Sequence, residues 1–241
     1  MIRWIEPDWP PPAGVRAATT LRVGGFSKGT FAEFNPAAHV GDDSFAIAQN
    51  RRLLQKSLAL PNAPVWLRQV HGVRVVRADR ACGVETADAS YTHATGVVCA
   101  VLTADCLPLL LCSRKGGLVA AVHGGWRGLL AGVIQMTLQA FDKNEVIAWL
   151  GPAIGPEHFE VGGEVRAAFV EKSNDFAAAF QARPHGKWLA DIYAIAKIIL
   201  VGSGIVDVYG GGFCTYADSK RFYSYRRDGV TGRMATLIWR E

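Results

Sequence analysis

Two continuous apolar runs near the middle of the chain place the strongest constraint on its fold. Residues 97–102 are apolar apart from Cys99, and residues 118–122 are apolar throughout. Apolar runs of this length that do not alternate with polar residues are typical of buried strands. We therefore predict one or two buried strands within residues 94–112 and another at residues 118–122.

The rest of the pattern mixes helices and strands without strict alternation. Residues 1–20 are expected to form an extended lead-in that ends in a strand at 15–21. Helices are predicted at 44–60 (capped by Ser44 and ended by Pro61), from the Gly124–Gly125 turn to Phe141, at 163–180 and at 192–201. Further strands are predicted at 64–70, 73–78 and 146–150, with a hairpin joining 222–227 to 233–239 around Asp228 and Gly229. This order favours an α+β fold with layered sheets over a doubly wound parallel sheet.

Length and composition indicate a single domain over residues 1–241, because 241 residues of which 50% are hydrophobic suffice for one large core. The net charge is +5, but the basic residues are scattered and no nucleic-acid-binding motif is present, so we expect no nucleic-acid partner. No apolar run reaches about 18 residues, so we expect no membrane span. The five cysteines form no C-x-x-C pair and the N-terminus lacks a signal peptide pattern, which favours a cytoplasmic protein. We also expect a monomer.

Three metal-capable side chains stand at the ends of predicted strands, each beside glycine or proline. They are His71, Cys106 and His123. Two neutral imidazoles and one thiolate suit zinc and leave a fourth position open, which is typical of catalytic zinc. Copper also fits, because two histidines and one cysteine in a trigonal set are a copper geometry. The intervals between the three residues match no zinc-finger template, so the prediction depends on their local context.

Polar neighbours of these ligands are candidates for substrate binding or acid–base chemistry. The Gly124–Gly125 turn opens a helix N-terminus beside Arg127, where an anion such as phosphate can bind; the plainer alternative is an ordinary strand-to-helix turn. Asp105 is a partner that orients a ligand, a general base, or simply a turn residue. Gln69 either hydrogen-bonds substrate or caps a strand.

Two adjacent arginines, Arg226 and Arg227, fall in the predicted C-terminal hairpin. Neighbouring side chains of a strand point to opposite faces, so at most one of the two faces a given pocket. A solvated hairpin tip is the equally plain alternative. The pair is therefore a candidate for substrate binding in which one member is expected to contribute.

Several longer motifs follow one another along the chain. They are RVGGFS (22–27), GDD (41–43) with NR (50–51), QVHG (69–72), TADCLP (103–108), HGGWRG (123–128), GPAIGP (151–156) with FEV (159–161), and SYRRDG (224–229) with TGR (231–233). Together they resemble the YfiH family, also called the laccase-domain or polyphenol oxidase family, from about residue 20 to the C-terminus. Two positions depart from the family pattern: Gly124 stands where alanine is common, and Ala153 where members often carry cysteine.

The resemblance implies a four-layer α/β/β/α sandwich with mixed sheets. It also implies a metal ion, usually zinc, bound by His71, Cys106 and His123. Members are described as purine nucleoside phosphorylases that act on adenosine, inosine and methylthioadenosine, with adenosine deaminase activity. Older descriptions call them copper polyphenol oxidases or cysteine hydrolases.

The residue inventory separates these activities. The chain has six histidines, and the four that remain after two bind the central metal are too dispersed for a conventional trinuclear copper cluster. This argues against a laccase-like polyphenol oxidase as the main function. A cysteine hydrolase would use Cys106 as nucleophile with His71 or His123 as base, but one sulfur cannot fully serve as nucleophile and metal ligand at once.

The function that uses all these residues is a zinc-dependent purine nucleoside enzyme. Phosphate would be held by Arg127, the Gly124–Gly125 turn and either Arg226 or Arg227, and Asp105 would protonate the leaving base. A metal-activated water would serve deamination of adenosine. The non-catalytic alternative is a binding module that a metal stabilises.

Overall fold

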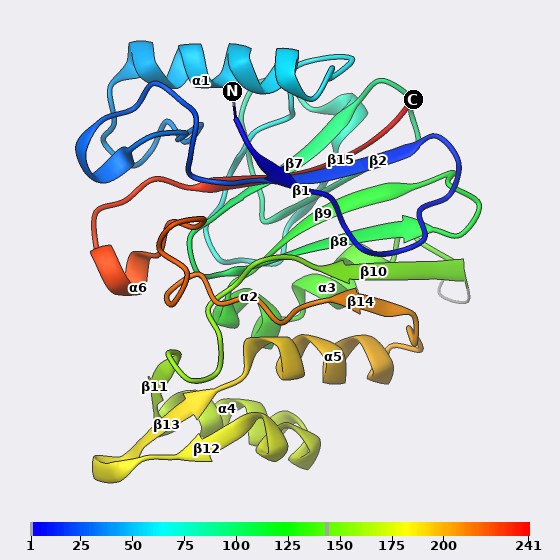
Figure 1. Ribbon diagram of the computed structural model, residues 1–241. Helices are drawn as coiled ribbons and strands as arrows, with labels where there is room; N and C mark the ends of the chain where they lie inside the picture. Colours follow the sequence, from blue (N-terminus) through cyan, green and yellow to red (C-terminus); the bar gives the residue numbers. More distant parts are fainter. Residues whose placement is uncertain (1, 143–144) are drawn as a thin grey trace.

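The centre of the structure, a computed structural model that describes residues 2–142 and 145–241, is a pair of β-sheets packed face to face (Figure 1). The antiparallel sheet runs in the order β1 (Trp4–Ile5), β2 (Val15–Thr20), β15 (Met234–Arg240) and β7 (Val98–Thr103). The mixed sheet runs in the order β14 (Val208–Gly210), β10 (Val146–Leu150), β8 (Leu107–Ser113), β9 (Val119–Gly124), β6 (Ala89–Thr92) and β4 (Val75–Arg77). Its outer pairs, β14 with β10 and β4 with β6, are parallel.

Helices cover the outer faces of both sheets (Figure 1). The antiparallel sheet is covered by α1 (Ser44–Ser57), and the mixed sheet by α2 (Trp126–Ala131), α3 (Val133–Leu138) and α5 (Ile192–Gly202). The four-layer sandwich that the resemblance implies is therefore confirmed. None of the helices in the described residues is long and apolar enough to cross a membrane.

Smaller elements complete the chain. A three-stranded antiparallel sheet of β11 (Glu160–Gly162), β13 (Lys187–Ala190) and β12 (Phe180–Ala182) contacts α4 (Gly163–Lys172). A short parallel pair joins β3 (Leu67–Arg68) to β5 (Glu85–Thr86). One further helix, α6 (Tyr225–Asp228), comes shortly before β15. The β3–β5 pair and α6 hold segments at the edge of the candidate site.

The apolar runs are continuous because both faces of the central strands are buried. In β8, Leu110 packs between the sheets, whereas Leu109 and Leu111 pack against the helices. In β7, Val101 faces the mixed sheet and Ala100 packs in the cluster that includes α1. Each strand thus divides its side chains between two cores, and neither face needs polar residues.

Several predicted helix boundaries differ from the structure. The helix predicted at 163–180 ends at 172, where a 3-10 helix (Asn174–Ala179) and then β12 follow it, and the helix predicted at 44–60 ends at 57. Asp43, rather than Ser44, caps α1, since its carboxylate accepts a hydrogen bond of 2.8 Å from the backbone N–H of Ala46. The single helix predicted from the Gly124–Gly125 turn to Phe141 is two helices that meet at Gly132, which has a φ of 103°. A left-handed residue ends one helix and turns the chain into the next.

The predicted C-terminal hairpin is wrong in its first half. Instead of a strand at 222–227, Ser224 caps the short helix α6 by accepting a hydrogen bond of 3.2 Å from the Arg227 N–H. The Asp228–Gly229 signal therefore marks the end of a helix, where Gly229 has a φ of 69°. β15 pairs instead with β2 and β7. The N-terminal segment is also more ordered than a lead-in, because β1 and β2 both belong to the antiparallel sheet.

Leu110→Ala tests the packing between the two sheets. Leu110 is fully buried there, so the substitution is expected to lower the free energy of unfolding by about 2–5 kcal/mol through lost apolar contact and an unfilled cavity. Urea titration measures the change. Val206→Ala is the control, since Val206 is 77% exposed and its truncation should have an effect within about 0.5 kcal/mol. A loss below about 1 kcal/mol for Leu110→Ala would contradict a tightly packed interface.

Candidate metal and active site

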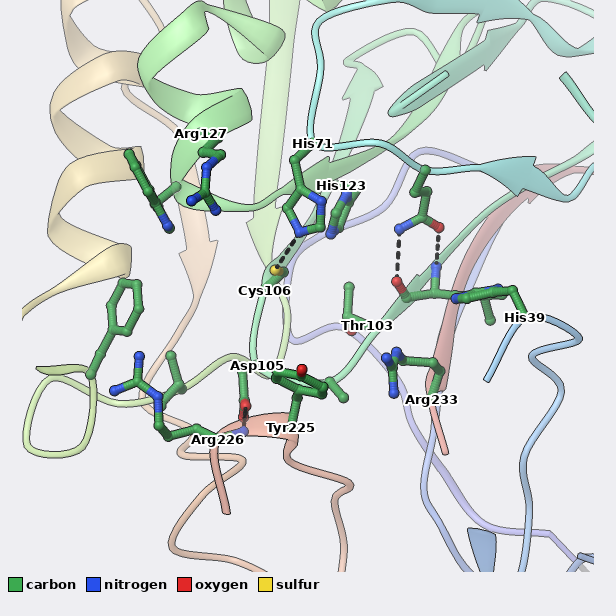
Figure 2. Close-up of a pocket in the computed structure, with 16 residues that line it drawn as sticks. His39, His71, Thr103, Asp105, Cys106, His123, Arg127, Tyr225, Arg226 and Arg233 are labelled. Carbon is green, nitrogen blue, oxygen red and sulfur yellow. Dashed lines mark hydrogen bonds between the residues drawn. The ribbon is translucent and has the colours of Figure 1, made fainter. Parts of the chain in front are cut away.

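The three predicted metal ligands converge at one end of the sandwich (Figure 2). His71 lies in the loop after β3, Cys106 directly precedes β8, and His123 lies in β9. Their candidate ligand atoms all lie within 4.8 Å of one another, and Cys106 Sγ is 3.6 Å from His71 Nε2. The register of β8 and β9 pairs Pro108 with His123, which brings the histidine to the end of β8 that carries Cys106.

Asp88 connects His71 and His123, and it is not among the residues predicted from the sequence. Its fully buried carboxylate accepts hydrogen bonds from the backbone N–H groups of Val70 (3.2 Å), His71 (2.8 Å) and Gly72 (2.7 Å). It also lies 2.8 Å from Nδ1 of His123. A carboxylate only accepts at this contact, so Nδ1 carries the proton and Nε2 is left to bind a metal. Little in the sequence indicates this role, because Asp88 is a single acidic residue between two alanines.

The surroundings of Cys106 and His123 favour charge on both groups. Burial acts to raise the pKa of the Cys106 thiol, but His123 and His71 outweigh it and lower the pKa. Burial acts to lower the pKa of His123, but Cys106 and Asp88 outweigh it and raise the pKa. Burial similarly opposes the charge of Asp88, yet its hydrogen bonds with His123 and Gly72 lower its pKa overall. The sulfur is thus poised as a thiolate, which is the form that binds metal.

The two glycines after His123 leave space for groups that lie close to the backbone. A Cβ atom on Gly125 would lie 2.5 Å from Cδ2 of His71 and 3.2 Å from Sγ of Cys106. Gly124 belongs to β9, not to the turn as predicted, and a Cβ there would lie 2.9 Å from the Leu107 carbonyl oxygen. Glycine is needed where other groups approach the backbone this closely.

A cavity of about 530 Å³ opens onto the three ligands. It is lined by His39, Gln69, His71, Leu102, Thr103, Ala104, Asp105, Cys106, His123, Trp126, Arg127, Ile154, Phe159, Tyr225, Arg226 and Arg233. Gln69 lines it, but its side-chain amide donates to the Leu102 carbonyl and accepts from the Leu102 N–H, both at 2.8 Å. Its polar atoms therefore tie the loop of His71 to β7.

Asp105 lies beside Cys106 with a φ of 91°, and both of its carboxylate oxygens are engaged. Oδ1 accepts from the Thr215 hydroxyl at 2.6 Å, and Oδ2 accepts from the backbone N–H of Arg226 at 2.7 Å. These contacts join the turn between β7 and β8 to the start of α6. Of the predicted roles for Asp105, they favour positioning over proton transfer.

The predicted arginines have different surroundings. Arg127 is exposed and lies over the Trp126 ring, with its Cζ 4.4 Å from the ring centroid. Arg226 lines the cavity and donates to the Glu160 carbonyl at 2.9 Å. Arg227 is turned away: its guanidinium donates to backbone carbonyls of residues 215, 216 and 222 and does not line the cavity. One member of the adjacent pair thus faces the pocket, although the segment is helical.

Two cavity residues with basic side chains were missed in the sequence. Arg233 precedes β15, and His39 lies in the loop before α1. In Figure 2 they lie on one side of Cys106, and Arg127 and Arg226 lie on the other. Both belong to, or lie near, motifs noted in the sequence, but only the long-range pairing of β15 with β7 brings Arg233 to the predicted metal ligands.

Comparison with known proteins identifies the family. The family model described as multi-copper polyphenol oxidoreductase laccase matches residues 16–241. The chain is a member of this family. The residues matched include all three metal-capable side chains and every residue that lines the cavity.

Several proteins of known name are similar to this chain over nearly its whole length. A Pseudomonas aeruginosa protein named a purine nucleoside phosphorylase is 52% identical over 243 residues, covering 99% of each chain. The Escherichia coli purine nucleoside phosphorylase YfiH is 49% identical, again with 99% of each chain covered. A solved Neisseria meningitidis structure superposes with a TM-score of 0.96 at 46% identity, covering 99% of each chain. YlmD from Geobacillus stearothermophilus gives 0.88 at 30% identity, covering 99% of this chain and 96% of its own.

Gly125→Ala is expected to abolish tight zinc binding, because the added methyl group would displace His71 or Cys106. Competition against a fluorescent chelator measures the affinity. Gly202→Ala is the matched control, since nothing lies within 4 Å of its Cβ position. Equal zinc affinity in the two variants would show that the close approach at Gly125 does not shape the site.

Asp88→Asn is expected to weaken zinc binding by about 10–100-fold, the usual cost of losing a carboxylate behind a histidine ligand. The asparagine amide has one oxygen, so either the Oδ1 partners (the His71 N–H and His123 Nδ1) or the Oδ2 partners (the Val70 and Gly72 N–H groups) lose their acceptor. The same chelator competition applies. Glu85→Gln removes an exposed ion pair with Arg74 and should leave the affinity unchanged. Wild-type affinity in Asp88→Asn would rule out an orienting role for Asp88.

Proposed function

We propose that this protein is a zinc-dependent purine nucleoside enzyme. It would cleave adenosine, inosine and methylthioadenosine with phosphate to give the base and a sugar 1-phosphate, and it would also deaminate adenosine. The observation that carries the proposal is the cluster of His71, Cys106 and His123 at a cavity that is also lined by arginines and aromatic rings. Two relatives, 52% and 49% identical in sequence to this chain, are named purine nucleoside phosphorylases, and these names support the same activity.

The donor set suits zinc. His71 and His123 would contribute imidazole nitrogens and Cys106 its thiolate, while Gly125 and Asp88 keep them close and oriented. Bound zinc would supply Lewis acidity and lower the pKa of a coordinated water. Copper is the alternative metal for a set of two histidines and one cysteine. In the described residues, however, these three form the one group with metal-ligand spacing, which weighs against a multicopper oxidase.

The cavity offers separate features for a nucleoside and for phosphate. Trp126, Phe159 and Tyr225 line it and provide aromatic faces for a purine. Arg127 and Arg226 also line the cavity and supply positive charge that can bind phosphate. In phosphorolysis an oxygen of hydrogen phosphate attacks C1′ of the ribose and the bond from C1′ to N9 breaks. The base leaves with the proton that the hydrogen phosphate gives up. We assign Asp105 to hold the Arg226 segment in place, since both its oxygens accept hydrogen bonds within the protein.

A cysteine hydrolase is the second candidate, because one observation favours it. The Cys106 thiol has a lowered pKa and lies 3.6 Å from a His71 nitrogen, an arrangement that can activate a nucleophile. Metal content separates the two candidates. A hydrolase would be active without metal, whereas the nucleoside enzyme would need zinc on the same sulfur.

The direct test combines elemental analysis with product identification. Protein purified without added metal is expected to contain about one zinc ion per chain, as a single three-ligand site requires. Incubated with adenosine and phosphate, it should release adenine and ribose 1-phosphate, and inosine should also form. Cys106→Ala should lose both zinc and these products, while Cys82→Ala, at an exposed cysteine away from the cavity, should keep them. Full phosphorolysis by Cys106→Ala would overturn the proposal.

Arg127→Ala is expected to raise the KM for phosphate by about tenfold or more, since a charge-assisted hydrogen bond contributes about 1.5–3 kcal/mol. The KM for adenosine should change much less. Steady-state kinetics with one substrate varied at a time measures both values. Equal increases in the two KM values would count against a phosphate contact by Arg127.

A further inference from the structure

A buried hydroxyl without a protein partner faces the cavity at Thr103. This last residue of β7 is 1% exposed, and its Oγ1 makes no hydrogen bond with the residues that the structure describes. Other buried threonines of the same sheet have hydrogen-bond partners for their hydroxyl groups. Thr19 Oγ1 lies 2.9 Å from Thr236 Oγ1, and Thr20 Oγ1 accepts from the Ala235 N–H at 2.9 Å. Leaving a buried hydroxyl unpaired is destabilising, so the Thr103 hydroxyl calls for a partner outside the protein.

Arg233 lies close to Thr103 and lacks a counter-ion. Thr103 pairs across the sheet with Met234, the residue next to Arg233. Nη1 of Arg233 donates to the carbonyls of Thr231 (2.8 Å) and Gly232 (2.9 Å). Within residues 2–142 and 145–241 it forms no ion pair, and its Nε and Nη2 donate no hydrogen bond. Burial lowers the pKa of Arg233, which reflects the cost of a cation held out of water.

His39 adds a third polar group at the rim of the same side of the cavity (Figure 2). A polar network holds its loop in place: Asp42 accepts from Ser27 (2.6 Å) and Asn35 (2.9 Å), and Asn50 donates to the Asn35 carbonyl (2.9 Å). Asn35 in turn accepts from the Arg233 backbone N–H at 3.0 Å. The sequence motifs at 22–27, 41–43 and 50–51 thus hold the His39 loop against the segment of Arg233.

We propose that Thr103 and Arg233, with His39 at the rim, form an oxyanion subsite that binds a phosphoryl group. It lies on the opposite side of Cys106 from Arg127 and Arg226 (Figure 2). A guanidinium with free N–H groups, a hydroxyl and an imidazole offer donors from three separate segments of the chain, and such a set suits the several oxygens of a phosphoryl group. Asp105 and Cys106 are negative groups that act on this guanidinium, and both oppose the effect of burial on the pKa of Arg233. Neither forms an ion pair with Arg233 in the described residues, and both Asp105 oxygens accept hydrogen bonds from Thr215 and the Arg226 backbone.

The phosphoryl group can come from two sources. It is either inorganic phosphate, the second substrate of phosphorolysis, or a phosphate carried by the nucleoside itself. In the first case this subsite holds the attacking phosphate in place of Arg127 and Arg226. In the second case the enzyme accepts nucleoside monophosphates, and Arg127 and Arg226 hold the attacking phosphate. Only this choice between the two sources rests on the proposed function. The subsite itself can be tested without turnover, because binding of a phosphoryl group can be measured directly.

The test is a binding experiment on zinc-loaded protein with inorganic phosphate and with adenosine 5′-monophosphate, each titrated alone by calorimetry. Arg233→Gln is expected to weaken binding of at least one ligand by about tenfold or more, and Thr103→Val by about fivefold. Thr103→Ser should restore the affinity, since it keeps the hydroxyl. Arg74→Gln, at an exposed ion pair away from the cavity, should bind like wild type.

The pattern of losses identifies the source. If both variants lose inorganic phosphate, the subsite holds the free anion; if they lose only the monophosphate, it holds a group on the substrate. Wild-type affinity for both ligands in Arg233→Gln and Thr103→Val, or no binding of either ligand by the wild type, overturns the subsite. Zinc content and the unfolding midpoint are measured for each variant, and Thr103→Ala, which also removes the hydroxyl, replaces Thr103→Val if the latter does not fold. If phosphate binds here while no sugar phosphate is ever formed, the subsite stands and the proposed function fails.

Discussion

The buried carboxylate of Asp88 joins the parts of the site that the sequence keeps apart. It accepts three successive backbone N–H groups of the His71 loop and faces Nδ1 of His123. One group thereby fixes the path of a loop, the orientation of a histidine ring and the nitrogen that points to the metal. Because His71 has a φ of 60°, its loop needs such external support to keep this conformation. The site is built around this interaction, and the glycine at 125 leaves the space that the converging ligands need.

The layered sheets supply the rigidity on which these contacts depend. β8 and β9 are buried on both faces and paired in register, so they hold Cys106, which directly precedes β8, and His123 in fixed positions. The cavity forms where the two sheets end and loops from several distant segments meet. Residues near 39, 71, 105, 126, 159 and 226 reach it from loops and helix starts, which leaves the site accessible while its metal ligands stay fixed.

The convergence of His71, Cys106 and His123 could be predicted from the sequence because each follows or ends an apolar run beside glycine or proline. The rest of the site could not be predicted in this way. Asp88 has no pattern of its own, and its importance comes from partners 16–18 and 35 residues away. Arg233 and Thr103 become neighbours only through the pairing of β15 with β7. The Asp228–Gly229 signal was read as a hairpin because local residues favour both a tight turn and a helix end, and the cap at Ser224 selects the helix.

The claim on which the proposed chemistry depends is that His71, Cys106 and His123 hold one metal ion together. Zinc K-edge X-ray absorption of the purified protein tests it most directly. We expect one sulfur neighbour at about 2.3 Å and two imidazole nitrogens at about 2.0–2.1 Å, with the sulfur signal lost in Cys106→Ala. A zinc spectrum without sulfur, or with a second metal atom close to the first, would contradict a mononuclear site built from these three residues.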